Sequence, residues 1–187
     1  MKGDIKGKTA DLQGALFDLG KRLDNGEESQ LLVWVIPGAL ACAHRPLRHH
    51  PEFGRGHRGR NLPAEAASAV LAWVRCVRHL GIRSVICLMH PQEFKHYARL
   101  DLGVKDLLDL YRTEGLVVRH IPWEDPAHRS AVERSSYQEE LARVRVETLD
   151  AFDALPKPIL LHCSAGMDRS SPVAAYIWHE RVGNSQA

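Results

Sequence analysis

The stretch from Pro158 to Ser171 constrains the fold of this 187-residue chain more than any other part of its sequence. Ile159, Leu160 and Leu161 form a continuous apolar run, which is typical of a strand buried on both faces of a sheet. A short loop with one glycine follows, and a helical pattern begins after it. A strand, a glycine-containing loop and a helix in this order predict an anion-binding site at the helix N-terminus.

The loop between this strand and helix is expected to surround an anion with backbone amides. Gly166 can adopt the positive φ that a tight turn of this kind requires, and successive N–H groups can then point to one spot. The helix that begins at Ser170 and Ser171 directs the positive end of its dipole to the same spot. Arg169 adds a guanidinium group, whose fork of donors fits two phosphate oxygens at once.

A cysteine in such a field is expected to be a thiolate at neutral pH. Helix N-termini and nearby cations lower the pKa of cysteines in general from about 8.5 to roughly 3.5–7.5. The cysteine that directly follows the apolar run, at position 163, is therefore a candidate nucleophile, and Arg169 is the candidate phosphate ligand. The alternative is a buried structural cysteine with an arginine nearby by coincidence.

Cys163, five further residues and Arg169, with His162 before and Ser170 after, resemble the signature of the cysteine-dependent protein tyrosine phosphatase superfamily. The short length of the chain is most similar to the dual-specificity branch. Only residues 163–170 match specifically, whereas residues 31–181 are compatible with the resemblance. Strands that alternate with helices and end in this strand–loop–helix site predict a three-layer α/β fold with a mainly parallel central sheet flanked by helices, as in the dual-specificity phosphatases that the chain resembles.

The resemblance also implies a role for each residue of the motif. Cys163 attacks phosphorus to form a phosphocysteine, and Arg169 binds the phosphoryl oxygens through the transition state. Ser170 stabilises the departing thiolate, and His162 supports the loop without transferring a proton. Inorganic phosphate or a similar oxyanion is expected to fit the phosphate-binding loop, which consists of Ser164, Ala165, Gly166, Met167 and Asp168.

Breaking a phosphate ester also requires an acid that protonates the leaving oxygen. In the superfamily this acid is an aspartate on a mobile loop, which follows a strand and precedes the cysteine in sequence. Asp125, in the stretch Pro122–Pro126, matches this position, and Glu124 is the second candidate. The alternative is an ordinary turn carboxylate. The implied mechanism needs no metal and no organic cofactor.

Residues 44–60 differ in composition from the rest of the chain, because they contain five arginines, four histidines, three glycines and two prolines. This composition predicts an exposed loop. Such a loop can form a basic rim that attracts an anionic substrate, such as a lipid headgroup or nucleic acid, or it can be solvated without a partner. The histidines lack the spacing of a metal-ligand set.

Strand and helix patterns alternate along the remaining sequence. Strands are expected over residues 31–36, 39–43, 83–89 and 116–121, and helices over 9–23, 92–100, 104–114 and 135–155. A further helix is expected to be capped by Asn61 and ended by Gly81. We expect one compact domain, in which residues 1–30 form a helical extension of a phosphatase-like domain at 31–187. Members of the family commonly continue with further helices, so the C-terminal half is expected to be short.

The chain as a whole gives few clues to a partner. Its formal net charge is only +2, so we expect no stable complex with nucleic acid. Four cysteines without paired spacing are typical of reduced thiols in a cytoplasmic protein. No stretch approaches the ~20 apolar residues of a membrane span. The pattern of residues does not indicate an oligomeric state.

The resemblance favours a phosphotyrosine or phosphoserine/threonine protein as the substrate. Asp168 is a departure, since some phosphoinositide-directed relatives carry an aspartate there, although such relatives often place lysines where this chain has Ser164, Ala165 and Met167. A phosphatase of a phosphoinositide, an RNA 5′-phosphate or another small phosphoester is therefore the alternative. An inactive phosphopeptide-binding module is a third hypothesis.

Overall fold

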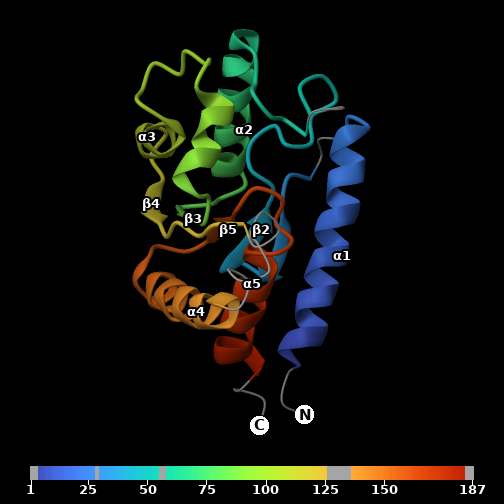
Figure 1. Cartoon of the computed structure of the whole chain (residues 1–187), viewed down its shortest axis with the longest axis vertical. Coiled ribbons are helices and arrows are strands. Elements are labelled where there is room, and N and C mark those ends of the chain that lie inside the picture. Colours follow the sequence, from blue (N-terminus) through green and yellow to red (C-terminus); the bar gives the residue numbers. More distant parts are fainter. Residues whose placement is uncertain (1–3, 28–29, 55–57, 126–135, 184–187) are drawn as a thin grey trace.

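The structure is a computed structural model that describes residues 4–27, 30–54, 58–125 and 136–183. Its centre is a five-stranded sheet in the order β1-β2-β5-β3-β4 (Figure 1). β1 is antiparallel to β2, whereas β2, β5, β3 and β4 run parallel to one another. The strands are β1 (Val33–Ile36), β2 (Leu40–Ala43), β3 (Ser84–Cys87), β4 (Val117–His120) and β5 (Ile159–His162).

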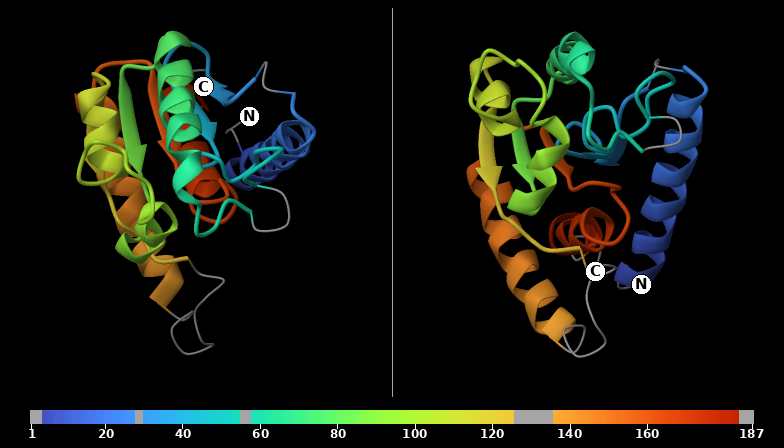
Figure 2. Two further views of the ribbon diagram at one scale, coloured as in Figure 1. Left: turned by 90° about the horizontal axis from the view of Figure 1, so that it is seen from above. Right: turned by 45° about the horizontal axis from the view of Figure 1, so that its top comes forward.

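Helices lie on both faces of this mixed sheet, so the predicted α/β architecture is confirmed (Figure 2). On one face are α1 (Ile5–Asp24), α4 (Tyr137–Ala154) and α5 (Ser170–Trp178). On the other are α2 (Ala67–His79) and α3 (Leu107–Thr113). Short helical turns complete the described structure: η1 (Ala64–Ala66), η2 (Pro91–Tyr97) and η5 (His179–Gly183).

The apolar run of β5 is buried on both sides, as its sequence predicts. Ile159 and Leu161 lie in the core formed with α1, α4 and α5. Leu160 lies in the opposite core, formed with α2 and α3. This division follows from the strand geometry, since successive side chains point to opposite faces of a sheet.

The central position of β5 decides where its following loop lies. His162, the last residue of β5, is the register partner of Ala43 in β2 and of Cys87 in β3. The segments that follow β2, β3 and β5 therefore start side by side at one edge of the sheet. In open α/β sheets this carboxyl edge is where ligands bind.

α1 packs against α5 and β1 through the leucine stripe that predicts a helix at residues 9–23. The helix begins earlier, at Ile5, because Asp4 accepts hydrogen bonds from the backbone N–H groups of Lys6 and Gly7 and so caps it. Leu16, in the middle of the stripe, is fully buried. The same stripe places α1 directly behind the phosphate-binding loop, where Leu16 contacts Gly166.

Two predictions about local structure are wrong. Asn61 does not cap α2, because the turn η1 intervenes and neither η1 nor α2 has a side-chain cap. Residues 44–60 are not simply an exposed loop, since residues 44–47 are buried. The cause is Arg45, which turns inward and donates hydrogen bonds to the carbonyl oxygens of Arg58 and Gly59. Residues 55–57 of this segment lie outside the described residues.

None of the helices in the described part of the chain is both long and apolar enough to cross a membrane.

Candidate active site

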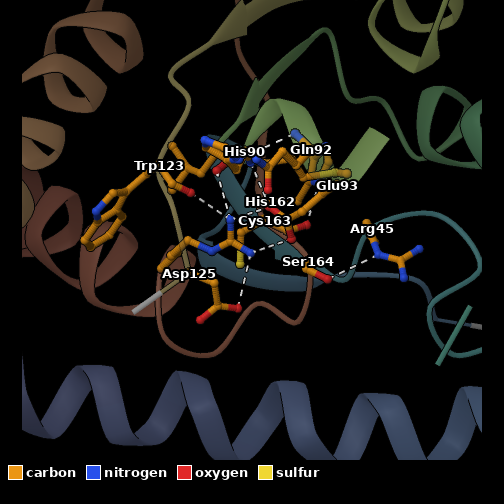
Figure 3. A network of polar contacts seen from close by, with 12 residues as sticks. Arg45, His90, Gln92, Glu93, Trp123, Asp125, His162, Cys163 and Ser164 are labelled. Atoms are coloured by element: carbon orange, nitrogen blue, oxygen red, sulfur yellow. Dashed lines mark hydrogen bonds and ion pairs between the residues drawn. The ribbon is translucent and has the colours of Figure 1, made fainter. Parts of the chain in front are cut away.

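Cys163 directly follows β5 and lies at the base of the phosphate-binding loop (Figure 3). Its side chain is only 1% exposed. The backbone N–H of Gly166 donates a hydrogen bond to Sγ over 3.2 Å. A donor at this distance stabilises negative charge on the sulfur. The sulfur therefore faces the amides of its own loop rather than the apolar core alone.

The loop turns as its sequence predicts, with Gly166 at a φ of 73°. An added Cβ at this position would lie 3.0 Å from Leu16 Cδ1 and 3.5 Å from the Ala43 carbonyl oxygen. Glycine is thus required here twice, once for the backbone conformation and once for the close approach of α1.

The carbonyl oxygens of the loop point to donors outside it. The N–H groups of the same peptides are thereby turned toward the inside of the loop, as in an anion-binding nest. Four carbonyls accept hydrogen bonds in this way: Ser164 O from the Arg45 N–H, Gly166 O from Ser171 Oγ, Met167 O from Gln13 Nε2 and Asp168 O from the Tyr137 hydroxyl. The fifth, Ala165 O, lies 2.9 Å from His44 Nδ1.

His162 supports the loop from beneath as a neutral ring. Nδ1 lies 3.0 Å from the Cys163 carbonyl oxygen, and Nε2 lies 3.1 Å from the Tyr111 hydroxyl. Because a carbonyl oxygen only accepts, Nδ1 carries the proton and Nε2 accepts from Tyr111. Burial lowers the pKa of His162 to about 4. At neutral pH the ring is therefore uncharged, which fits the supporting role expected for it.

Arg169 is fixed at the bottom of the site by a carboxylate that the sequence patterns do not single out. Its Nη1 and Nη2 atoms donate to the two carboxylate oxygens of Glu93 over 2.6 and 2.8 Å. Nη1 also donates to the carbonyl oxygens of Trp123 and Leu88, over 2.8 and 3.3 Å. The side chain is 1% exposed. The guanidinium plane is thus held in one orientation.

Charges around Arg169 keep it cationic. Burial by itself lowers the pKa of Arg169, but its hydrogen bonds to Glu93 and its attraction to the sulfur of Cys163 outweigh burial and raise it. In the same way, burial raises the pKa of Glu93, but Arg169 outweighs burial and lowers it. The pair is therefore ionised at neutral pH, with a net charge near zero before a substrate arrives.

Asp125 reaches the same place from the segment after β4. One of its carboxylate oxygens lies 3.5 Å from Arg169 Nη2, and Figure 3 shows its side chain pointing toward the loop. Glu124 lines the same pocket, so both acid candidates are brought to the site. Burial and the negative charge of Asp125 raise the pKa of Asp168, a third carboxylate of this pocket. Pro126 lies outside the described residues.

Trp123 anchors the segment that carries Asp125. Its side chain is 1% exposed, and its Nε1 donates to Glu140 over 2.9 Å. The indole ring also stacks on Tyr137, with 5.5 Å between ring centroids. Both partners belong to α4, so this helix holds the segment at the edge of the loop.

The Ser170 hydroxyl is fully buried and has no hydrogen-bond partner among the described residues. A buried hydroxyl without a partner costs about 1–3 kcal/mol. The expected bond from Ser170 to the thiolate is not formed in this state, so that role stays a prediction. The same residue lies at the start of α5, one position after Arg169.

A pocket of about 560 Å³ opens above the loop. Its lining contains four carboxylates, Glu93, Glu124, Asp125 and Asp168. It also contains four basic side chains, Arg48, Arg58, Arg60 and Lys95. Within the described ranges, no group of three or more His, Cys, Asp or Glu side chains is arranged to hold a metal ion.

Sequence analysis alone overlooks Glu93 and Arg45. Glu93 carries one signal, because it stands in a His-Pro-Gln-Glu sequence right after a buried strand, and such a sequence can form a capping box. In the structure the His90 N–H does donate to Glu93, over 2.7 Å. Arg45 carries no comparable signal. Its Nε donates to Ser164 Oγ over 3.2 Å, which ties the segment after β2 to the phosphate-binding loop.

No protein-family model and no curated protein matches this chain.

Proposed function

We propose that the chain is a cysteine-dependent phosphoester hydrolase with the fold and mechanism of the dual-specificity protein phosphatases. One observation carries this proposal. In the loop between Cys163 and Arg169, carbonyl oxygens accept hydrogen bonds from groups outside the loop, one backbone amide donates to the sulfur, and a guanidinium is held in a fixed position by Glu93. These are the groups that an oxyanion with three equatorial oxygens requires.

In the first step, the Cys163 thiolate attacks phosphorus and the P–O bond to the leaving alcohol or phenol breaks. Asp125 gives its proton to the leaving oxygen, so that an alcohol rather than an alkoxide departs. The loop amides and Arg169 bind the phosphoryl oxygens throughout. The position of Asp125, 3.5 Å from Arg169 Nη2, supports this assignment, because it puts the acid beside the group that binds the phosphate.

In the second step, water attacks the phosphocysteine and Asp125, now ionised, accepts a proton from that water. The S–P bond breaks, inorganic phosphate is released and Cys163 returns as a thiolate. Ser170, whose buried hydroxyl has no partner among the described residues, is the residue that we propose donates to the sulfur as the S–P bond breaks.

The proposal is tested with an aryl phosphate and a single-turnover acid quench. We expect phosphate release and, in the quenched protein, a phosphoryl group on the peptide that contains Cys163. Because Cys76 is exposed and Cys42 and Cys87 are buried, the experiment is best done with Cys76→Ser as the background. Turnover without phosphocysteine, or phosphate found on another residue, would contradict the mechanism.

Asp125→Ala is expected to lower turnover of an alkyl phosphate by about 10²–10⁴-fold, since an alkoxide leaves slowly without a proton. Turnover of an aryl phosphate with an acidic phenol should fall much less, because a phenolate leaves unaided. The measurement is kcat for both esters, with Glu124→Gln as the matched variant. Unchanged turnover of the alkyl ester by Asp125→Ala would assign the acid role to Glu124 or another residue.

A phosphopeptide-binding module without activity is the competing proposal. It predicts tight phosphopeptide binding and no turnover of any phosphoester. The position of Asp125 beside Arg169, at the loop whose Gly166 N–H donates to the sulfur of Cys163, speaks against it. The proposal allows both phosphoproteins and non-protein phosphoesters as substrates. The basic side chains of the pocket help to distinguish between these two classes.

A further inference from the structure

Four basic side chains beside the phosphate-binding loop have no carboxylate partner in the part of the chain that the structure describes. Arg48, Arg58 and Arg60 come from the segment after β2, and Lys95 comes from η2. All four line the 560 Å³ pocket. Arg169 differs from them, because its charge is already balanced by carboxylates.

Arg48 contacts the phosphate-binding loop directly. Its Nη1 donates to the hydroxyl of Ser164, the next residue after Cys163, over 3.2 Å. Its Nε is buried and has no hydrogen-bond partner among the described residues. Burial and the charges of neighbouring arginines, Arg45 first, lower the pKa of Arg48 to about 10. The guanidinium is nevertheless charged at neutral pH and lines the pocket, so its positive charge can attract an anion there.

Holding several cations together without a counter-charge is unfavourable, unless an anion binds between them. Arginine is suited to phosphate, because its planar fork donates to two oxygens at once. A pocket of this size also exceeds what one phosphoryl group fills, since pockets of about 300–1,000 Å³ hold whole small molecules. The group bound over Cys163 therefore leaves these basic side chains free for a second anion.

We propose that Arg48, Arg58, Arg60 and Lys95, here called the basic subsite, bind a second phosphoryl group of the substrate. The enzyme would then act on small molecules with two neighbouring phosphoryl groups, such as a phosphorylated polyol or a nucleoside polyphosphate. This inference rests on the phosphatase function proposed above and names its substrate class.

The position of Arg48 favours a small molecule over a doubly phosphorylated peptide. Arg48 donates to the side chain of Ser164, the residue next to Cys163, so an anion bound by Arg48 lies close to the phosphoryl group bound over Cys163. Phosphates on adjacent ring carbons, or linked in a chain, fit this short separation. In an extended peptide, neighbouring side chains point to opposite faces, and those on one face are two residues apart.

The test compares kcat/KM for an aryl phosphate, inositol monophosphate, a free inositol bisphosphate with vicinal phosphates, and a doubly phosphorylated peptide. We expect kcat/KM for the bisphosphate to exceed that for the monophosphate by about 10²-fold, since two charge-assisted hydrogen bonds to the second phosphate contribute roughly tenfold each. Arg58→Gln combined with Arg60→Gln should lower this ratio at least tenfold. Both side chains are exposed, so the variant is expected to fold. Arg83→Gln is the matched control, because Arg83 is exposed at the opposite end of β3 and should leave the ratio unchanged.

A second set of assays decides whether the natural substrate is a lipid or a free metabolite. In these assays the same phosphorylated headgroup is presented on lipid vesicles. Faster turnover on vesicles would identify a lipid, and faster turnover of the free compound a metabolite; either supports the basic subsite. A wild-type enzyme that hydrolyses the aryl phosphate but shows no preference for the bisphosphate would overturn it, as would higher kcat/KM for a doubly phosphorylated peptide. If no phosphoester is hydrolysed at all, the proposed function itself fails, which is a different outcome.

Discussion

Cys163→Ser is expected to lower hydrolysis of an aryl phosphate by roughly 10⁴-fold or more while leaving phosphate binding in place. Loss of a nucleophile removes the whole covalent pathway, and comparable losses in other enzymes reach about 10⁶-fold. Binding should persist, because the oxygens of the phosphate are held by loop amides and by Arg169 rather than by the sulfur. The measurements are turnover of an aryl phosphate and calorimetric titration with inorganic phosphate.

The same substitution distinguishes the enzyme from a binding module. If the loop only binds phosphopeptides, wild type and Cys163→Ser should both fail to turn over and should bind phosphopeptide alike. Cys42→Ser is the matched control, because Cys42 is buried in the neighbouring strand β2 and burial raises its pKa far above the usual range. It should leave turnover intact. Equal residual activity in Cys163→Ser and wild type would remove the assignment of the nucleophile.

The parts of the site that could be predicted from sequence are those encoded within one short segment. A buried strand, a glycine at positive φ, a cysteine and an arginine within residues 158–171 specify strand, loop and helix locally, and the structure has all three there. The strand order around this segment was not predicted. The strand order depends on which helices cover which face of the sheet. Residues close together in sequence do not determine this arrangement.

The groups that hold the loop in place could not be predicted, because they come from distant parts of the chain. Glu93 and Arg169 are 76 residues apart, and Arg45 and Ser164 are 119 residues apart. Arginine is rarely buried in full unless it is paired, so a basic stretch such as 44–60 is read as solvent-exposed. In the structure, backbone carbonyl oxygens accept the hydrogen bonds of the buried Arg45 guanidinium instead. No sequence pattern predicts which carbonyls these are.

The rigidity of the site therefore depends on residue pairs that are distant in sequence. Its effect on catalysis can be measured by substituting Arg169. Arg169→Lys keeps the positive charge but cannot make two parallel bonds to Glu93 while also binding a phosphate. We expect kcat for an aryl phosphate to fall by about 10³-fold, which is the upper end of what one transition-state donor contributes. KM should change far less, since the loop amides still bind the ground state. The measurement is the split between kcat and KM.

Glu93→Gln tests whether Glu93 acts only through Arg169. Glutamine keeps the shape but replaces one acceptor by a donor, so the guanidinium loses its fixed plane, and we expect kcat to fall about 10–100-fold. If Glu93 is a positioning residue, Arg169→Lys combined with Glu93→Gln should be no slower than Arg169→Lys alone, because the second change has nothing left to disturb. If the losses in kcat from the two single substitutions multiply in the double variant, Glu93 instead contributes to turnover independently of Arg169. Glu114→Gln is the matched control: Glu114 makes an equivalent two-bond pair with Arg75, whose guanidinium is exposed, and its loss should leave kcat unchanged.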